Sequence, residues 1–147
     1  MKKYTKVLVP TDGSEFADIA EKRALKLASE IDAEIIILTI AENEVSFGFR
    51  YKSAAKALSE ALMEDAKAII EHAKELAKDY SDVKIDYRIL EGSPASVILD
   101  TVKEDDIDLL IIGSSSKSGV SKFVMGSVAE RVVSYAECDV LVIHKVK

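Results

Sequence analysis

Short hydrophobic runs alternate along this chain with longer stretches in which apolar residues recur every three or four positions. The short runs are rich in β-branched residues, as buried strands are, and they occupy residues 6–10, 34–40, 84–90, 109–112 and 140–144. Strands that alternate with helices favour right-handed βαβ units around a parallel sheet. The pattern therefore predicts a three-layer α/β/α protein with a five-stranded parallel sheet in the order 3-2-1-4-5.

The longer stretches predict helices that each bury one face. The first begins after Ser14, a favourable N-cap residue, and its apolar stripe consists of Phe16, Ala20, Ala24, Leu27, Ala28 and Ile31. The second covers residues 54–79, and its apolar face consists of Leu58, Leu62, Ala66, Ile69, Ala73, Leu76 and Tyr80. A third helix begins at Ser93 and Pro94, since proline is favoured in the first turn.

Length and composition predict how many domains the chain forms and in which cellular compartment it works. The chain has 147 residues, of which 48% are hydrophobic and 31% are charged, and this predicts a single domain over residues 1–147. Its apolar runs are far shorter than the roughly 20 residues that a membrane-spanning helix needs. A lone cysteine, Cys138, cannot form a disulfide within one chain, which favours a reducing compartment. We therefore expect a cytoplasmic protein.

Charge narrows the classes of partner. The formal net charge is −6, the wrong sign for a protein that neutralises phosphates along nucleic acid or at an anionic membrane. Asp105, Asp106 and Asp108 are close together, but they precede the fourth strand at its amino end. We expect a solvated turn there rather than a metal site.

The strand order also predicts where a ligand binds. Open α/β sheets bind ligands beyond the carboxyl ends of their strands, at the point where the strand order reverses. That point lies between the first and fourth strands here, so the relevant loops are residues 10–14 and 113–126. Asp12 in the first loop is placed to meet a ribose hydroxyl or a metal. A turn in which Asp12 only accepts hydrogen bonds from neighbouring amides is the alternative.

The second loop is rich in glycine and serine and ends where a helix begins. Glycines let the backbone approach a ligand, hydroxyls donate to phosphate oxygens, and a helix amino terminus adds further N–H donors. This is the chemistry of an anion site. Ser127 also fits a capping box with Glu130, in which it caps the helix. Both interpretations stay open, and one residue can serve both.

Taken together, the motifs resemble the universal stress protein domain over nearly the whole chain. They are V-P-T-D-G-S at 9–14, G-S-P at 92–94, D-L-L-I-I-G at 108–113, G-S-V at 126–128 and C-D-V-L-V-I at 138–143. ATP-binding members carry G-x-x-G-x9-G-[ST] after the fourth strand. Gly113, Gly126 and Ser127 fit this pattern, whereas Ser116 stands at its second glycine. The resemblance implies a fold similar to the adenine nucleotide alpha hydrolases.

The resemblance further implies a site for ATP, with Mg²⁺ neutralising phosphate charge. Asp12 would reach the ribose, and the backbone at Thr11 and Ile40, beside Pro10, would frame the adenine. The residues expected to hold the phosphates are Gly113, Ser116, Gly126, Ser127 and Val128. Lys117 could neutralise phosphate charge, although lysines in exposed loops are more often solvated.

Two functions stay open, a regulatory module of the stress response that binds ATP and a dimeric interaction protein that binds no nucleotide. Ser116 separates them, since a serine held at positive φ costs about 1 kcal/mol. The sequence has no Ser-His-Asp set, paired catalytic carboxylates or metal motif, so we expect at most slow hydrolysis by the bound nucleotide alone.

The last predicted strand, at the edge of the sheet, concerns assembly. Its apolar run, residues 140–143, favours antiparallel pairing with the same strand of a second copy, and the resembling family commonly dimerises through this strand. We therefore expect a homodimer. Lys145 and Lys147, which follow the run, would protect the edge in the alternative.

Overall fold

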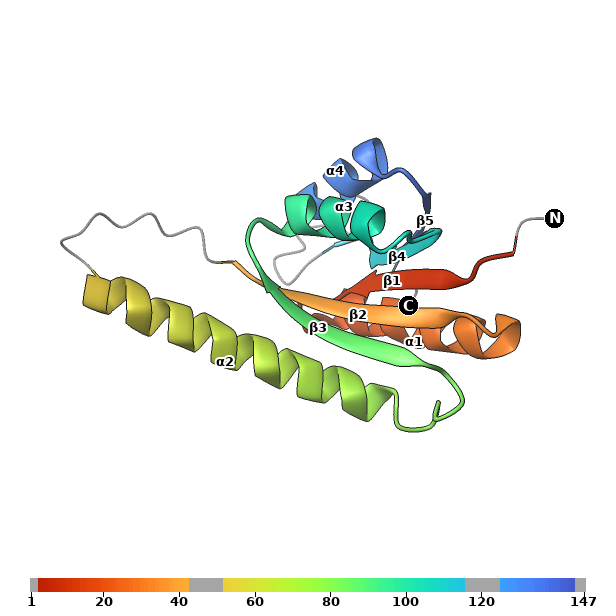
Figure 1. Ribbon diagram of the computed structural model, residues 1–147, viewed down its shortest axis with the longest axis horizontal. Helices are drawn as coiled ribbons and strands as arrows, with labels where there is room; N and C mark the ends of the chain where they lie inside the picture. The colour runs from red at the N-terminus through yellow and green to blue at the C-terminus, as the bar shows by residue number, and fades with distance from the viewer. Residues whose placement is uncertain (1–2, 43–51, 116–124, 145–147) are drawn as a thin grey trace.

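The computed structural model describes residues 3–42, 52–115 and 125–144. Within these ranges, strands and helices alternate from the first element to the last (Figure 1). The strands are β1 (Lys6–Pro10), β2 (Glu34–Ala41), β3 (Ile85–Glu91), β4 (Leu109–Gly113) and β5 (Asp139–Ile143). The helices are α1 (Glu15–Ile31), α2 (Lys52–Leu76), α3 (Pro94–Glu104) and α4 (Ser127–Tyr135). The strands begin and end within one residue of the predicted positions.

The sheet confirms the predicted topology. All four strand pairings are parallel, and the order is β3-β2-β1-β4-β5. The central strand β1 pairs with β2 through Val7 and Ile35 and with β4 through Val7 and Leu109. The chain therefore proceeds from β1 to one side of the sheet and later returns to the other side. This reversal sits where ligand binding is expected.

Two hydrophobic cores fill the spaces above and below the sheet, because alternate residues of each buried strand point to opposite faces. On one face, Val7, Val9 and Ile37 belong to a core covered by α1 and α2. On the other face, Leu8, Leu38 and Ile112 belong to a core covered by α3 and α4. Figure 1 shows these helices on either side of the sheet. Burial on both faces explains why the inner strands β1, β2 and β4 appear as nearly continuous apolar runs in the sequence.

The first helix differs in part from its prediction. Ser14 is its N-cap, as predicted, and the Ser14 side chain accepts a hydrogen bond from the Ala17 N–H at 3.2 Å. The buried face, however, consists of Ala17, Ala20, Glu21, Ala24, Leu25 and Ala28, whereas Phe16, Leu27 and Ile31 are only partly buried. The predicted stripe was therefore wrong by part of a turn. The actual stripe contains the carboxyl group of Glu21, which a search for apolar residues does not detect.

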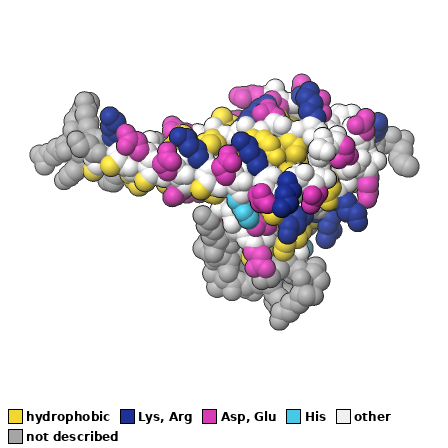
Figure 2. Space-filling model, turned by 90° about the horizontal axis from the view of Figure 1, so that it is seen from below, with side chains coloured by type: hydrophobic (Ala, Val, Ile, Leu, Met, Phe, Trp, Pro, Cys, Tyr) yellow, Lys and Arg dark blue, Asp and Glu magenta, His cyan; other side chains and the backbone are white. Residues whose placement is uncertain are grey.

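Only the carboxyl-terminal half of α2 packs on the sheet. Ala66, Ile70 and Ala73 are buried, but Leu58 is 38% exposed, so the predicted continuous buried face is wrong at its start. Figure 1 shows the amino-terminal part of α2 extending past the sheet. Figure 2 shows acidic and basic side chains alternating along this projecting helix. No helix in the described part of the chain combines the length and hydropathy needed to cross a membrane.

Two of the three aspartates before β4, Asp105 and Asp108, have structural partners, whereas Asp106 is exposed, as expected of a solvated turn. Asp108 accepts hydrogen bonds from the N–H groups of Thr5 at 2.9 Å and Lys6 at 3.1 Å, and so holds the start of β1. Asp105 accepts two hydrogen bonds from the Arg88 guanidinium, at 2.8 and 2.9 Å, and so connects the end of α3 to β3. These partners are distant in the sequence, so a local sequence pattern could not predict them.

Candidate functional site

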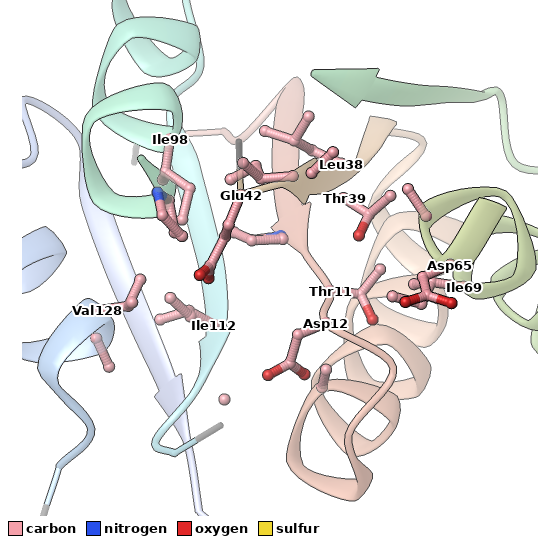
Figure 3. Close-up of a pocket in the computed structure, with 18 of the residues that line it drawn as sticks. Thr11, Asp12, Leu38, Thr39, Glu42, Asp65, Ile69, Ile98, Ile112 and Val128 are labelled. Atoms are coloured by element: carbon pink, nitrogen blue, oxygen red, sulfur yellow. The ribbon is translucent and has the colours of Figure 1, made fainter. Parts of the chain in front are cut away.

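A cavity of about 510 Å³ opens at the carboxyl ends of β1, β2 and β4. Its walls come from these strand ends, from the start of α1, and from α2, α3 and α4. Figure 3 shows side chains from these elements converging on it. The cavity therefore lies at the switch point of the sheet, where ligands of open α/β sheets bind.

The loop after β1 forms the first wall and is held by local hydrogen bonds. The Thr11 N–H donates to the Leu38 carbonyl oxygen at 2.8 Å, which ties the loop to β2. The Thr11 hydroxyl oxygen accepts from the Gly13 N–H at 3.1 Å, and Asp12 Oδ1 accepts from the Ser14 N–H at 2.9 Å. Gly13 has a φ of 77°, which suits glycine. Asp12 therefore takes part in a local turn, and it also lines the cavity, so both interpretations of this residue stay open.

The end of β4 and the start of α4 form the second wall. A Cβ on Gly113 would lie 2.9 Å from the backbone oxygen of Phe16, so the strand end and α1 approach too closely for any side chain. The Ser114 N–H donates to the Ile143 carbonyl oxygen at 2.8 Å, and the Gly126 N–H donates to the Ser114 carbonyl oxygen at 2.7 Å. These bonds place the start of α4 beside the end of β4.

The predicted capping box is wrong. Gly126 is the N-cap of α4, without a side-chain cap, and its carbonyl oxygen accepts from the Glu130 N–H at 2.9 Å. Ser127 is therefore the first helical residue, and its exposed side chain lines the cavity. The first N–H groups of a helix have no acceptor within the helix. Those of Ser127, Val128 and Ala129 belong to residues at the cavity wall.

Most of the predicted site residues come together. Those that line the cavity are Pro10, Thr11, Asp12, Ile40, Gly113, Ser127 and Val128. Gly126 adjoins this group as the N-cap of α4 but is not among the lining residues. Ser116 and Lys117 lie outside the described residues. The loop after β1 and the described start of the second loop, at Gly113 and Ser115, therefore border one cavity.

Sequence reasoning missed a third wall. From α2, the cavity is lined by Leu62, Asp65, Ala66 and Ile69, and from α3 by Pro94 and Ile98. Leu62, Ala66 and Ile69 belong to the predicted apolar face of α2. That spacing signals a buried face but does not indicate that the face reaches the end of the sheet.

Charge is unevenly distributed around the cavity. Among the described lining residues, Asp12, Glu42 and Asp65 carry carboxylates, and none is Lys, Arg or His. Within the described ranges, no group of three or more acidic, His or Cys side chains has the geometry of a metal site. The carboxylates suit a ligand part rich in hydrogen-bond donors, whereas the start of α4 suits an anion.

The fold is an open parallel α/β sheet with a cavity at its switch point, which is the usual position of ligands in proteins of this class. The chain belongs to the universal stress protein family, whose model matches residues 3–144. This confirms the resemblance drawn from the motifs.

Individual relatives agree with this assignment. A universal stress protein of Methanocaldococcus jannaschii is 35% identical over 144 residues, which is 98% of this chain and 84% of that protein. The structure of UspA from Lactobacillus plantarum matches with a TM-score of 0.89 and 26% identity, over 98% of this chain and 100% of that one. A universal stress protein crystallised in complex with cAMP matches with a TM-score of 0.70 and 26% identity, over 97% and 98% of the two chains.

Proposed function

We propose that this protein binds an adenine nucleotide, ATP with Mg²⁺ first among them, and acts as a regulatory module of the cytoplasmic stress response. The observation that carries the proposal is the cavity that brings Asp12, Gly113 and Ser127 together at the switch point. The family relationship supports it, because a relative of 26% identity was crystallised with cAMP. Because the sequence has no Ser-His-Asp set, paired catalytic carboxylates or metal motif, we propose at most slow hydrolysis.

The proposal assigns each wall to one part of the nucleotide. Asp12 accepts from the ribose hydroxyls, and the backbone at Thr11 and Ile40 contacts the adenine. The apolar side chains of Ile98, Ile112 and Val128 provide a surface for the face of the base. The N–H groups of Ser127 and Val128 donate to phosphate, with Gly113 leaving room beside them. Because its N–H already donates to Ser114, Gly126 would contribute through its lack of a side chain.

Ser116 belongs to the proposed phosphate site on the basis of the family pattern, and Lys117 on the basis of its charge. The negative charge of the described cavity wall strengthens the need for Mg²⁺, because phosphate brought into it meets three carboxylates and no described basic side chain. Affinity for ATP should therefore depend on the metal more strongly than affinity for AMP.

Calorimetric titration with ATP, with and without Mg²⁺, tests the proposal. The unmodified protein should bind with a dissociation constant below 1 mM, about the weakest that such a titration resolves. Gly126→Val should weaken binding by about tenfold or more, because its branched side chain narrows access to the amino terminus of α4. Ser134→Val, an exposed position near the other end of α4, is the matched control. Denaturing the purified protein and analysing the supernatant by chromatography detects nucleotide that copurifies.

The alternative is a dimeric interaction protein that binds no nucleotide, and the edge of the sheet favours the dimer itself. Strand β5 is terminal in the sheet, and Leu141 on it is 39% exposed. Val133 and Tyr135, at the end of the adjoining α4, are 41% and 68% exposed. We propose that β5 pairs antiparallel with β5 of a second copy, which satisfies both strand edges in one symmetric contact.

Light scattering tests the dimer independently of the nucleotide. The unmodified protein at micromolar concentration should exceed the chain mass of 16.1 kDa and approach twice that value. Val142→Lys, or removal of residues 140–147, should release monomer or cause aggregation. Leu141→Lys changes a more exposed side chain and should release monomer with less disturbance of the core. If the unmodified protein has the mass of a monomer, the dimer is rejected. If it is a dimer that binds no nucleotide, the alternative function is selected.

A further inference from the structure

The wall contributed by α2 is held firmly against the Asp12 loop. Gly13 approaches Ile69 so closely that a Cβ on Gly13 would lie 3.1 Å from Ile69 Cγ1. One turn further along α2, His72 Nε2 lies 2.8 Å from Asp18 Oδ2 on α1. Ala66 and Ile70 of the same stretch are buried. This part of α2 therefore has a defined position next to the loop after β1.

Asp65 lies on the cavity side of this anchored stretch. It precedes Ile69 by four residues, so the two side chains occupy the same face of the helix. Both line the cavity. Figure 3 shows Asp65 and Ile69 on the same side of the cavity as Thr11, Thr39 and Asp12, with Ile98, Ile112 and Val128 on the other side. Two carboxylates from different elements, Asp12 and Asp65, thus border the polar side of one cavity.

This arrangement makes the two ends of the cavity favour different parts of a ligand. The lining carboxylates of Asp12, Glu42 and Asp65 repel phosphate and the amino terminus of α4 attracts it, so an anionic group binds at the end formed by Ser127 and Val128. The carboxylates favour neutral groups that donate hydrogen bonds, because such bonds to an ionised acceptor are stronger than neutral ones. In a nucleotide, the vicinal hydroxyls of the ribose are donors of this kind.

We propose that Asp65 is a specificity-determining residue of the nucleotide site, which accepts a hydrogen bond from the ribose hydroxyls together with Asp12 and so selects ribonucleotides over nucleotides that lack these hydroxyls. The inference rests on the proposed function, since it concerns the same cavity. It differs from that function in its residue, because α2 carries none of the motifs by which the site was found. The long helix thereby contributes to ligand choice as well as to the core.

A ligand comparison by calorimetry tests the inference. AMP and 2′,3′-dideoxy-AMP are titrated into the unmodified protein, Asp65→Ala and Asp65→Asn. Glu64→Ala is the matched control, because Glu64 is the adjacent carboxylate, is 74% exposed and pairs with Lys67 on the surface. A lost hydrogen bond to a charged group weakens binding by about tenfold or more. The unmodified protein should therefore prefer AMP to the dideoxy analogue by at least about tenfold.

Asp65→Ala should reduce the preference for AMP severalfold, because it lowers the affinity for AMP. The affinity for the dideoxy analogue should change by less than about twofold. Asp65→Asn should give a partial loss, and Glu64→Ala should keep the full preference. An unchanged preference in Asp65→Ala, or an equal loss for both ligands, overturns the inference and leaves the proposed function standing. If the unmodified protein binds neither AMP nor ATP, the proposed function fails and the inference fails with it.

Discussion

Glu21 is a carboxyl group inside the protein, on the buried face of α1. Glu21 is 1% exposed, and neither of its side-chain oxygens has a hydrogen-bond partner within the described part of the chain. Burial, and next the negative charge of Asp18, raise the pKa of Glu21 from 4.5 to about 8, against a smaller opposing effect of Lys22. Glu21→Gln keeps the size and polarity of the protonated side chain and removes the ionisation.

The pKa gives both the sign and the size of the effect. The folded protein holds a proton that the unfolded chain releases above pH 4.5, so the associated stability is fully present below pH 4.5 and is lost as the pH rises towards about 8. Each pH unit costs about 1.4 kcal/mol, so at pH 7 the folded protein is destabilised by about 3 kcal/mol relative to a chain with a neutral side chain. Glu21→Gln should recover most of this amount.

Urea unfolding followed by far-ultraviolet circular dichroism measures the effect, since the chain has no tryptophan. The gain in unfolding free energy from Glu21→Gln should be smallest near pH 5 and increase to about pH 8. Glu30→Gln, at an exposed position of the same helix, is the control and should give no such gain. The pKa of Tyr87 provides a second readout, because burial and then the charge of Glu21 raise it. Glu21→Gln should therefore lower the pKa of Tyr87. If the unfolding free energies of the unmodified protein and of Glu21→Gln vary with pH in the same way, the account is refuted.

Two further predictions concern stability. Gly113→Ala should lower the unfolding free energy by about 1–3 kcal/mol, because the new Cβ would meet the backbone of Phe16, while Gly126→Ala, at a φ of −62°, should change it by less than about 1 kcal/mol. Arg88→Ala should cost about 1 kcal/mol in urea unfolding at neutral pH. The hydrogen bonds from Arg88 lower the pKa of Asp105, so this cost should shrink as the pH falls and Asp105 is protonated, and an effect that grows in acid would contradict the assignment.

The strands and their order could be predicted from the sequence because the sheet is covered on both faces. A strand such as β4 then consists of apolar residues throughout, and its ends stand out against the polar turns. Helix faces were harder. The pattern misses Glu21 because a buried carboxylate looks like a surface residue, and it includes Leu58 because periodicity does not show where the sheet beneath a helix ends.

The site was predictable where it is local in sequence. Asp12 follows β1 and Gly113 ends β4, and these strands meet at the switch point, so the topology alone brings the two positions together. Asp65 lies in the middle of a helix without a motif, and only the packing of Ile69 on Gly13 places it at the cavity. The role of Ser127 stayed open between a capping box and a ligand contact because the hydrogen bond from Gly126 to Ser114, at the start of α4, joins segments that no local pattern connects.

The location of the bound nucleotide is measured most directly by two-dimensional amide NMR of the 16.1 kDa chain during titration with AMP and with ATP and Mg²⁺. The account predicts saturable shifts at the residues proposed to contact the ligand, namely Thr11, Asp12, Ile40, Gly113, Ser127 and Val128. Signals from the exposed face of α2 and from the turn after it, such as those of Lys67 and Lys78, should stay in place. Shifts confined to another surface, or none at millimolar nucleotide, would contradict the claim that the cavity at the switch point binds adenine nucleotides.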